Sequence, residues 1–217
     1  MRNWMNVVAA CAIAMTALAA NTAAAEQRGG TEVEAVWKAQ TILLDYRSAG
    51  RTYRCDILAH KIKTILQRVG ANERLELKRF ACRDLAGHAR FEVRMRSPVE
   101  ATPENVHALT QYDSRHELVA RINGADLPSA TDMERFPAVW SSVSFRKLDL
   151  DAGDCALVQQ IRRQVLPLMS VEVLKDIKGV DCSQELTGIA GPRLVVLALV
   201  PVTASGHSDT SIDPKYR

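Results

Sequence analysis

The same cysteine spacing occurs twice in this chain, and this repetition limits what the chain can fold into. Cys55 and Cys82 are followed 100 residues later by Cys155 and Cys182. Each pair encloses a segment in which apolar residues recur at helical spacing. A fixed internal period indicates that one structural unit is repeated.

Two motifs outside the cysteine pairs recur as well, both displaced by 103 residues. They are Ala35-Val36-Trp37, repeated as Ala138-Val139-Trp140, and Pro98-Val99-Glu100-Ala101, matched by Pro201-Val202-Thr203-Ala204. We therefore predict a tandem duplication of a unit of about 67 residues, at 35–101 and 138–204.

The N-terminus has the features of a secretory signal peptide. Arg2 precedes an apolar run over 7–20, and the small residues 23–25 follow. A transmembrane anchor is the alternative, but the run is shorter than the roughly 20 residues that a spanning helix needs. A lipoprotein signal ending at Cys11 would leave too short an apolar centre. We predict a signal peptide at 1–25, no later membrane span, and a periplasmic or secreted protein.

The four remaining cysteines are expected to form disulfides, because exported thiols meet an oxidising environment. Four cysteines allow three connectivities, and a duplicated unit favours Cys55–Cys82 and Cys155–Cys182. Each bridge is worth roughly 3–4 kcal/mol in the chain-entropy model. The alternative uses, a metal site or a redox pair, lack a C-x-x-C motif and a histidine at ligand spacing.

Residue patterns within each unit predict the order strand, helix, strand, strand. In the first unit, a strand over 37–47 precedes an amphipathic helix that ends at Gly70, and strands over 75–82 and 90–96 follow. In the second unit, Asp154 is expected to cap a helix that ends at Pro167. The apolar run 194–200 has no polar face and predicts a strand buried on both sides.

The predicted fold class is therefore α+β. It consists of two βαββ units with mixed or antiparallel pairing, helices on one face and one disulfide per repeat. The sequence leaves open whether the six strands form one sheet or two.

Residues 102–137 belong to neither unit and predict a structured linker that packs across the sheet. Within it, 106–112 predicts a short strand, and Asp113 to Gly124 has the cap, body and stop of a helix. A capping box over 131–134 predicts a further short turn. The polar stretches 26–34 and 205–217 predict a loose start and a mobile tail.

A resemblance accompanies these patterns. It is carried by Tyr53-Arg54-Cys55-Asp56 with Leu58, by Gly153-Asp154-Cys155 with Leu157-Val158, by the linker's Arg135-Phe136-Pro137-Ala138-Val139-Trp140 and by the paired cysteines. In these features the chain resembles a group of uncharacterised exported proteobacterial proteins. The resemblance covers most of the mature chain and supports export and the bridge pattern. It implies no activity, because none is known for the group.

Charge is unevenly distributed although the net charge is only +3. Residues 45–100 carry 13 Lys and Arg against 7 Asp and Glu, whereas 101–217 carry 12 against 15. In the strand around 90–96, alternate residues are basic, and a neighbouring strand would add two more cations. The sequence thus predicts a candidate anion-binding face made of Arg74, Lys78, Arg90, Arg94 and Arg96. The alternative is a solvated sheet face with cross-strand ion pairs.

No catalytic, cofactor-binding or metal-binding residues are predicted. Hydrolase, phosphate-loop and dinucleotide motifs are absent from the sequence, and His60, His88, His107 and His116 are scattered. Asp149, Asp151 and Asp154 cluster, but they lack the further ligands of a calcium loop and are better explained by a turn and a helix cap.

Three functions remain open from the sequence. We expect a non-enzymatic periplasmic or secreted module that binds an envelope component or a protein partner. The alternatives are a hydrolase or transferase that acts on envelope material between the repeats, and a structural subunit of an envelope complex. Because aromatic residues make up only 5% of the chain, base stacking is poorly supported, which argues against nucleic acid as a partner.

Overall fold

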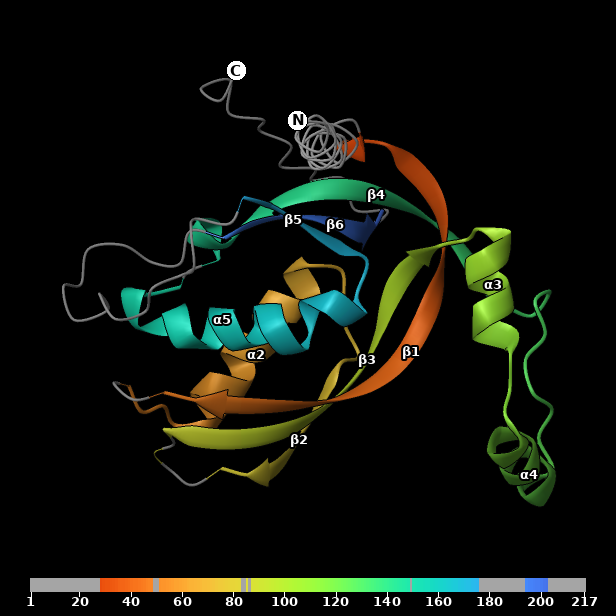
Figure 1. Ribbon diagram of the computed structural model, residues 1–217, viewed down its shortest axis with the longest axis horizontal. Coiled ribbons are helices and arrows are strands. Elements are labelled where there is room, and N and C mark those ends of the chain that lie inside the picture. The colour runs from red at the N-terminus through yellow and green to blue at the C-terminus, as the bar shows by residue number, and fades with distance from the viewer. Residues whose placement is uncertain are drawn as a thin grey trace, which may run out of the picture.

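The computed structural model describes residues 28–48, 51–82, 85, 87–148, 150–175 and 194–202 (Figure 1). The predictions for the signal peptide 1–25, Asp149, Cys182 and the tail 205–217 lie outside these residues. The described chain is α+β, with one six-stranded antiparallel sheet in the order β2-β3-β1-β4-β6-β5. The strands are β1 (Glu32–Arg47), β2 (Glu76–Ala81), β3 (His88–Glu100), β4 (Arg135–Ser144), β5 (Val171–Lys175) and β6 (Val195–Pro201). The helices are α2 (Cys55–Arg68), α3 (Pro103–Thr110), α4 (Ser114–Asn123) and α5 (Cys155–Gln164).

Two sets of elements follow each other with the same order along the chain. The first is β1-α2-β2-β3 and the second is β4-α5-β5-β6. The sheet keeps the three strands of each set together and joins the sets through the β1–β4 pair. The predicted strand–helix–strand–strand order is thus present in both sets, and their strands share one sheet.

β1 is the longest strand and belongs to both halves of the sheet. It pairs with β3 from Ala35 to Arg47 and with β4 from Glu32 to Val36. Between these two partners it bends sharply, so that the sheet wraps around α2 and α5 (Figure 1). The predicted loose start at 26–34 is wrong in its last residues, because pairing with β4 orders the chain from Glu32 onward.

The alanine and valine of both repeated motifs lie in the β1–β4 ladder. Glu34 lies opposite Pro137, so Ala35 faces Phe136 and Ala138 faces Val33. Both motif alanines are fully buried.

The outer ladders of the two sets differ in register. Trp37 pairs with Pro98, whereas Trp140 pairs with Leu199 and not with Pro201. Pro201 therefore pairs two positions away from the place that Pro98 takes in the first set. A shift of two residues keeps each side chain on its own face of the sheet, so the buried pattern is preserved.

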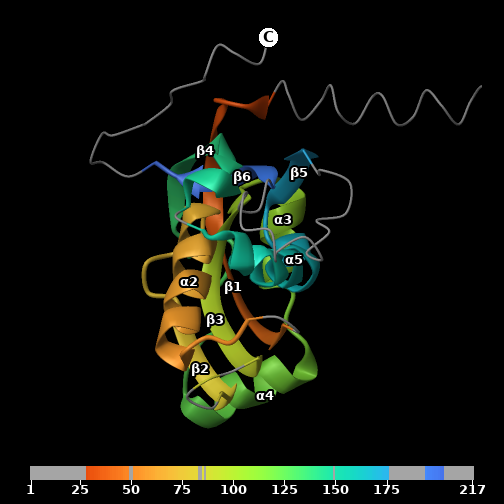
Figure 2. The ribbon, with the colours of Figure 1, turned by 90° about the vertical axis from the view of Figure 1, so that its left-hand side faces the viewer.

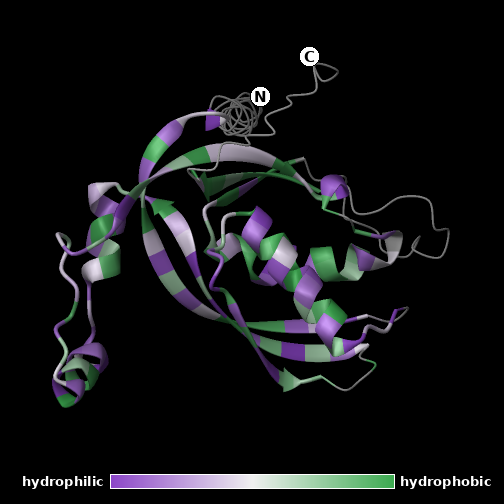
Figure 3. Cartoon of the chain, turned by 180° about the vertical axis from the view of Figure 1, so that it is seen from behind, coloured by the Kyte–Doolittle hydropathy of each residue, from purple (hydrophilic) through white to green (hydrophobic). Residues whose placement is uncertain are grey.

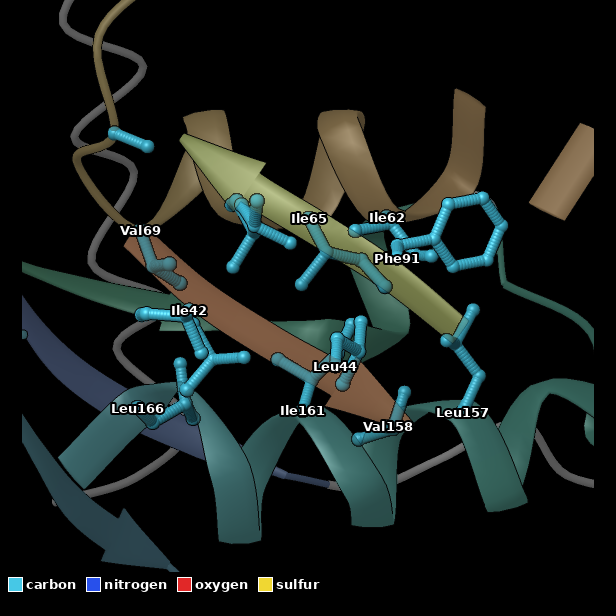
Figure 4. Packing of buried hydrophobic residues seen from close by; sticks show 14 of the residues in the cluster. Ile42, Leu44, Ile62, Ile65, Val69, Phe91, Leu157, Val158, Ile161 and Leu166 are labelled. Atoms are coloured by element: carbon cyan, nitrogen blue, oxygen red, sulfur yellow. The ribbon is translucent and has the colours of Figure 1, made fainter. Parts of the chain in front are cut away.

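The larger of two buried hydrophobic clusters fills the concave side of the sheet between the strands and both helices (Figure 4). Helical spacing aims Ile62 and Ile65 of α2 and Ile161 of α5 at this core, where they meet Leu44 and Phe91 from the strands. Along β1 and β3, hydrophilic and hydrophobic residues alternate (Figure 3), as expected of strands with one buried and one wet face. Because both helices contribute to one core, the two sets form one domain.

Two glutamines of α5 close an open edge of β1. Beyond Val36, no strand of the described chain pairs with β1 on its β4 side. There the Gln164 side chain accepts from Asp45 N and donates to Asp45 O, both at 2.9 Å. Gln160 does the same for Arg47, at 2.9 and 2.5 Å. Four residues along a helix rise about 6 Å, and two residues along a strand rise about 6.6 Å. Two glutamines spaced four residues apart on α5 therefore align with backbone groups spaced two residues apart on β1.

One disulfide joins the first residue of α2 to the residue after β2. Cys55 and Cys82 are bonded, with their Cα atoms 5.9 Å apart. This confirms the first predicted pair. Cys155 is buried at the corresponding first residue of α5. Its predicted partner lies outside the described residues, so that pair stays a prediction.

The linker contains two helices, and it departs from the predictions in two ways. The expected strand at 106–112 is helical, because Thr102 caps α3 by accepting from Asn105 N and Pro103 starts it. The expected packing across the sheet is wrong for α4, which has no buried residue. The short turn expected at 131–134 is present: Asp132 N donates to Ser129 O, the Asp132 carboxylate accepts from Ser129 N, and β4 begins after the turn at Arg135. The helix predicted between Asp113 and Gly124 is confirmed as α4.

Gly70 follows the end of α2 and lies against Leu199 of β6, so a substitution there shows how closely the two sets pack. Its φ is +101°, and a Cβ there would meet the backbone oxygen of Leu199 well inside contact distance. We expect Gly70→Ala to lower the free energy of unfolding by about 3 kcal/mol, from the backbone strain and the clash together.

The matched control is Gly124→Ala, where φ is +61° but nothing lies within 4 Å of the added methyl group. It should lose only about 1–2 kcal/mol. Urea unfolding of both variants measures the difference, and equal losses would show that Gly70 makes no close contact with β6.

Candidate functional site

The predicted basic face is formed by side chains of β3 that point away from the helices. Strict alternation buries Phe91, Val93 and Met95 in the core and turns Arg90, Glu92, Arg94 and Arg96 outward. Strands β1 and β2 flank β3 on either side and extend the same surface. We call this surface, formed by the outward side chains of β2, β3 and the C-terminal half of β1, the outer face.

Strand register shows which predicted residues the outer face brings together. Lys78 of β2 lies opposite Glu92, and Glu76 lies opposite Arg94. Four of the five predicted cations therefore share the face. Arg74 does not lie on a strand; it precedes β2 in the turn after α2.

Carboxylates on the same face neutralise some of these cations. Glu92 pairs with Arg94 at 2.6 Å. Asp45 of β1 is shared by Arg47 at 3.1 Å, His88 at 2.9 Å and Arg90 at 3.5 Å. The hydrogen bond from Arg47 lowers the pKa of Asp45, with a further contribution from His88. The pairs of Asp45 with His88 and Arg90 cross between β1 and β3, as in the alternative that the sequence offered, and surface pairs of this kind contribute little to stability.

Cations nevertheless exceed carboxylates on the outer face. Among the described residues, no ion pair involves Lys78 or Arg96, or Arg74 in the adjacent turn. The cations of the face are Arg47, Lys78, Arg90, Arg94 and Arg96, against Asp45, Glu76, Glu92 and, at the end of β3, Glu100. Guanidinium groups offer paired donors that match carboxylate and phosphate oxygens. The arrangement can therefore hold an anionic group without first breaking every internal pair.

Apolar side chains stand among these charges. Leu43 of β1 is 60% exposed and Phe80 of β2 is 55% exposed. The Lys78 ammonium lies 5.4 Å from the centre of the Phe80 ring. The outer face is thus basic and partly apolar.

A second cluster of titratable groups is buried where α2 and α5 begin. Asp154 is fully buried, and its carboxylate accepts from the Tyr53 hydroxyl, from Lys61 Nζ at 2.6 Å and from Asp151 N at 2.7 Å. Arg51 lies over the Tyr53 ring and pairs with Asp151 at 3.0 Å. Burial raises the pKa of the Tyr53 hydroxyl, and its bond to Asp154 raises this pKa further, so Tyr53 remains the donor.

This cluster, which we call the polar lock, ties the two sets of elements together. Tyr53 and Lys61 come from the first set, whereas Asp151 and Asp154 come from the second. The prediction that Asp154 caps α5 is wrong, because its carboxylate is used by Tyr53, Lys61 and the Asp151 amide and makes no cap hydrogen bond. Because Asp154 is closed off from solvent, we assign the polar lock a role in stabilising the fold.

Sequence reasoning missed both Asp45 and the lock. The alternation of β1 could have placed Asp45 on the outer face, but its sharing among three partners depends on the β1–β3 register. The partners Tyr53 and Asp154 lie 101 residues apart, and no local pattern signals such a contact.

No group of three or more His, Cys, Asp or Glu within the described ranges could hold a metal ion. The histidines remain dispersed there: His88 pairs with Asp45, His116 with Asp113, and His107 lies near Gln111. In the described part of the chain, no helix is long and apolar enough to cross a membrane.

Removing Asp154 tests the lock. Asp154→Ala leaves Lys61 and the Tyr53 hydroxyl without their shared acceptor in a buried setting, and we expect the free energy of unfolding to fall by about 3 kcal/mol. Asp151→Ala is the control, because Asp151 is largely exposed and its loss should stay within about 1 kcal/mol. Chemical denaturation measures the free energy of unfolding of both variants. A similarly small loss in each would show that Asp154 does not stabilise the fold through the polar lock.

Comparison with protein-family models, with curated proteins and with solved structures gives no match for this chain.

Proposed function

We propose that this protein is a non-enzymatic binding module, exported to the periplasm or secreted, whose outer face binds anionic groups of an envelope component. The observation that carries this proposal is the excess of arginine and lysine on one exposed surface of three adjacent strands. Lys78 and Arg96 have no ion-pair partner among the described residues, so they can pair with phosphate or carboxylate groups of a ligand.

The placement of the charged groups favours binding over catalysis. The outer-face cations are spread along β3 and its neighbours and are about half exposed. The polar lock does bring a tyrosine, a lysine and a carboxylate together, but Asp154 is fully enclosed by its own partners. An envelope-acting hydrolase or transferase with a site between the repeats therefore remains the weaker alternative, as does a purely structural subunit.

We also propose that the chain arose by tandem duplication of a βαββ unit, with one disulfide in each copy. Support comes from the equal order of elements in both sets, from the Ala-Val-Trp motifs on the β1–β4 pair, and from the first cysteine of each pair at the first residue of a helix.

Peptide mapping under non-reducing conditions tests the disulfide part of this proposal. We expect one linked peptide that contains Cys155 and Cys182, beside the Cys55–Cys82 peptide. A free thiol at Cys155 in protein purified from an oxidising compartment would contradict one bridge per copy.

Retention on a heparin column tests the anion-binding face. Changing Arg90, Arg94 and Arg96 to Ala should lower the salt concentration needed for elution, because those guanidinium groups would contact the sulfates and carboxylates of the polymer. Heparin serves here as a defined polyanion.

The control changes three exposed arginines elsewhere, Arg68, Arg146 and Arg163, to Ala. It lowers the net charge by the same amount, so any difference between the two variants reports on position. Equal elution of the two variants would remove the outer face as the binding site.

A further inference from the structure

The connection between β3 and β4 is much longer than its end points require. Glu100, at the end of β3, and Phe136, near the start of β4, both lie opposite Ala35, on either side of β1. Strands two places apart in a sheet are only about 10 Å apart, a distance that a few residues can span. The chain instead runs out through α3 and α4 before it returns (Figure 1). Long connections with their own structure are usually functional.

At the tip of this excursion, α4 exposes apolar side chains to solvent. Leu118 is 54% exposed and Ile122 is 73% exposed. They lie four residues apart and so share one side of the helix, about 40° apart around its axis. Val119 instead helps to line a shallow hollow between α4 and the returning chain at 125–127.

Capping stabilises α4 in place of burial. Asp113 accepts from His116 N at the start, and Gly124 adopts a left-handed conformation at the end, where Ala125 N donates to Ala120 O. A helix of this length is marginal in water without packing. The sequence thus builds a helix that the rest of the described chain does not cover.

Basic residues flank the apolar pair. On a helical projection, Arg115 and Arg121 lie about 60° from Leu118 on either side, whereas Glu117 lies about 100° away. A partner of α4 on this side would therefore offer apolar contact surrounded by negative charge.

The outer face and α4 both reach the lower side of the molecule, with α4 displaced toward the right in Figure 1. In Figures 1 and 2, α4 and β2 are both at the lower end, away from the core between α2 and α5. The outer face also combines basic residues with exposed apolar ones, Leu43 and Phe80. One extended surface could therefore contact both regions at once.

We infer that α4 and the outer face together bind an anionic phospholipid surface, with Leu118 and Ile122 entering the lipid and the outer-face cations lying against the headgroups. This inference rests on the proposed function and names the anionic partner. Two or three aliphatic side chains alone bind a membrane weakly, and basic residues alone also bind weakly, but the combination gives stable attachment. A second copy of the chain fits less well, because pairing two α4 helices would bring the arginines of both copies together and bury far less area than a stable dimer needs.

Sedimentation with vesicles tests this inference. The probes are vesicles of phosphatidylcholine with and without phosphatidylglycerol, and the full mature chain is used. We expect binding to the phosphatidylglycerol vesicles only, weakened by salt, and reduced about tenfold or more when Leu118 and Ile122 are both changed to Ser. The matched control changes Ile57 of α2 and Leu168 after α5 to Ser, since these two residues are also exposed but lie on the helix side.

The heparin column separates this inference from the proposed function. Heparin has no apolar phase, so L118S/I122S should leave retention unchanged while lowering vesicle binding. Vesicle binding that is unaffected by L118S/I122S, or equally reduced by I57S/L168S, would overturn the lipid inference and leave the anion-binding face intact. Loss of a dimer on gel filtration of L118S/I122S would also overturn it, by assigning the exposed side of α4 to a second copy.

Discussion

The fold depends on a single bent strand that serves both halves of the molecule. β1 pairs with β4 over Glu32–Val36 on one edge and with β3 over Ala35–Arg47 on the other, and beyond Val36 the β4-side edge has no neighbouring strand among the described residues. Gln160 and Gln164 of α5 satisfy that edge with side-chain amides, which act as a substitute strand. Backbone groups left unpaired there would destabilise the fold by about 1–3 kcal/mol each if buried. The glutamines therefore let β1 leave one half of the sheet and enter the other.

The bend sets which surfaces are inside and which are outside. The concave side receives both helices and forms one core, so the basic residues of β3 can only lie on the convex side. The polar lock and the Gly70–Leu199 contact hold the two halves together around that core. β3 itself is held by pairing with β1 and β2 and by its inward side chains in the core, and its outward side chains display the cations. The α3–α4 connection leaves near the same bend and carries an uncovered helix to the lower side of the molecule, where β2 also lies.

Local patterns in the sequence were enough to predict most of the elements. Alternation at 90–96 predicted β3 and its two faces, helical spacing predicted α2 and α5, and Asp113 with Gly124 predicted α4. Failures occurred where a distant partner decides the outcome. β1 starts early because β4 pairs with it, and Asp154 leaves its expected cap because Tyr53 and Lys61 bind its carboxylate. The basic residues of the outer face were predicted from the sequence, but the pairing of Arg90 with Asp45 depends on the β1–β3 register.

The central claim is that the convex side, with α4, is the binding surface, and that the helix side is not. Hydroxyl-radical footprinting tests it directly, because the method reports the exposure of individual Leu, Ile and Phe side chains. With vesicles that contain phosphatidylglycerol, compared with neutral vesicles, the account predicts protection of Leu43, Phe80 and Ile122 and no change at Ile57. Protection of Ile57, with Phe80 and Ile122 unchanged, would contradict it.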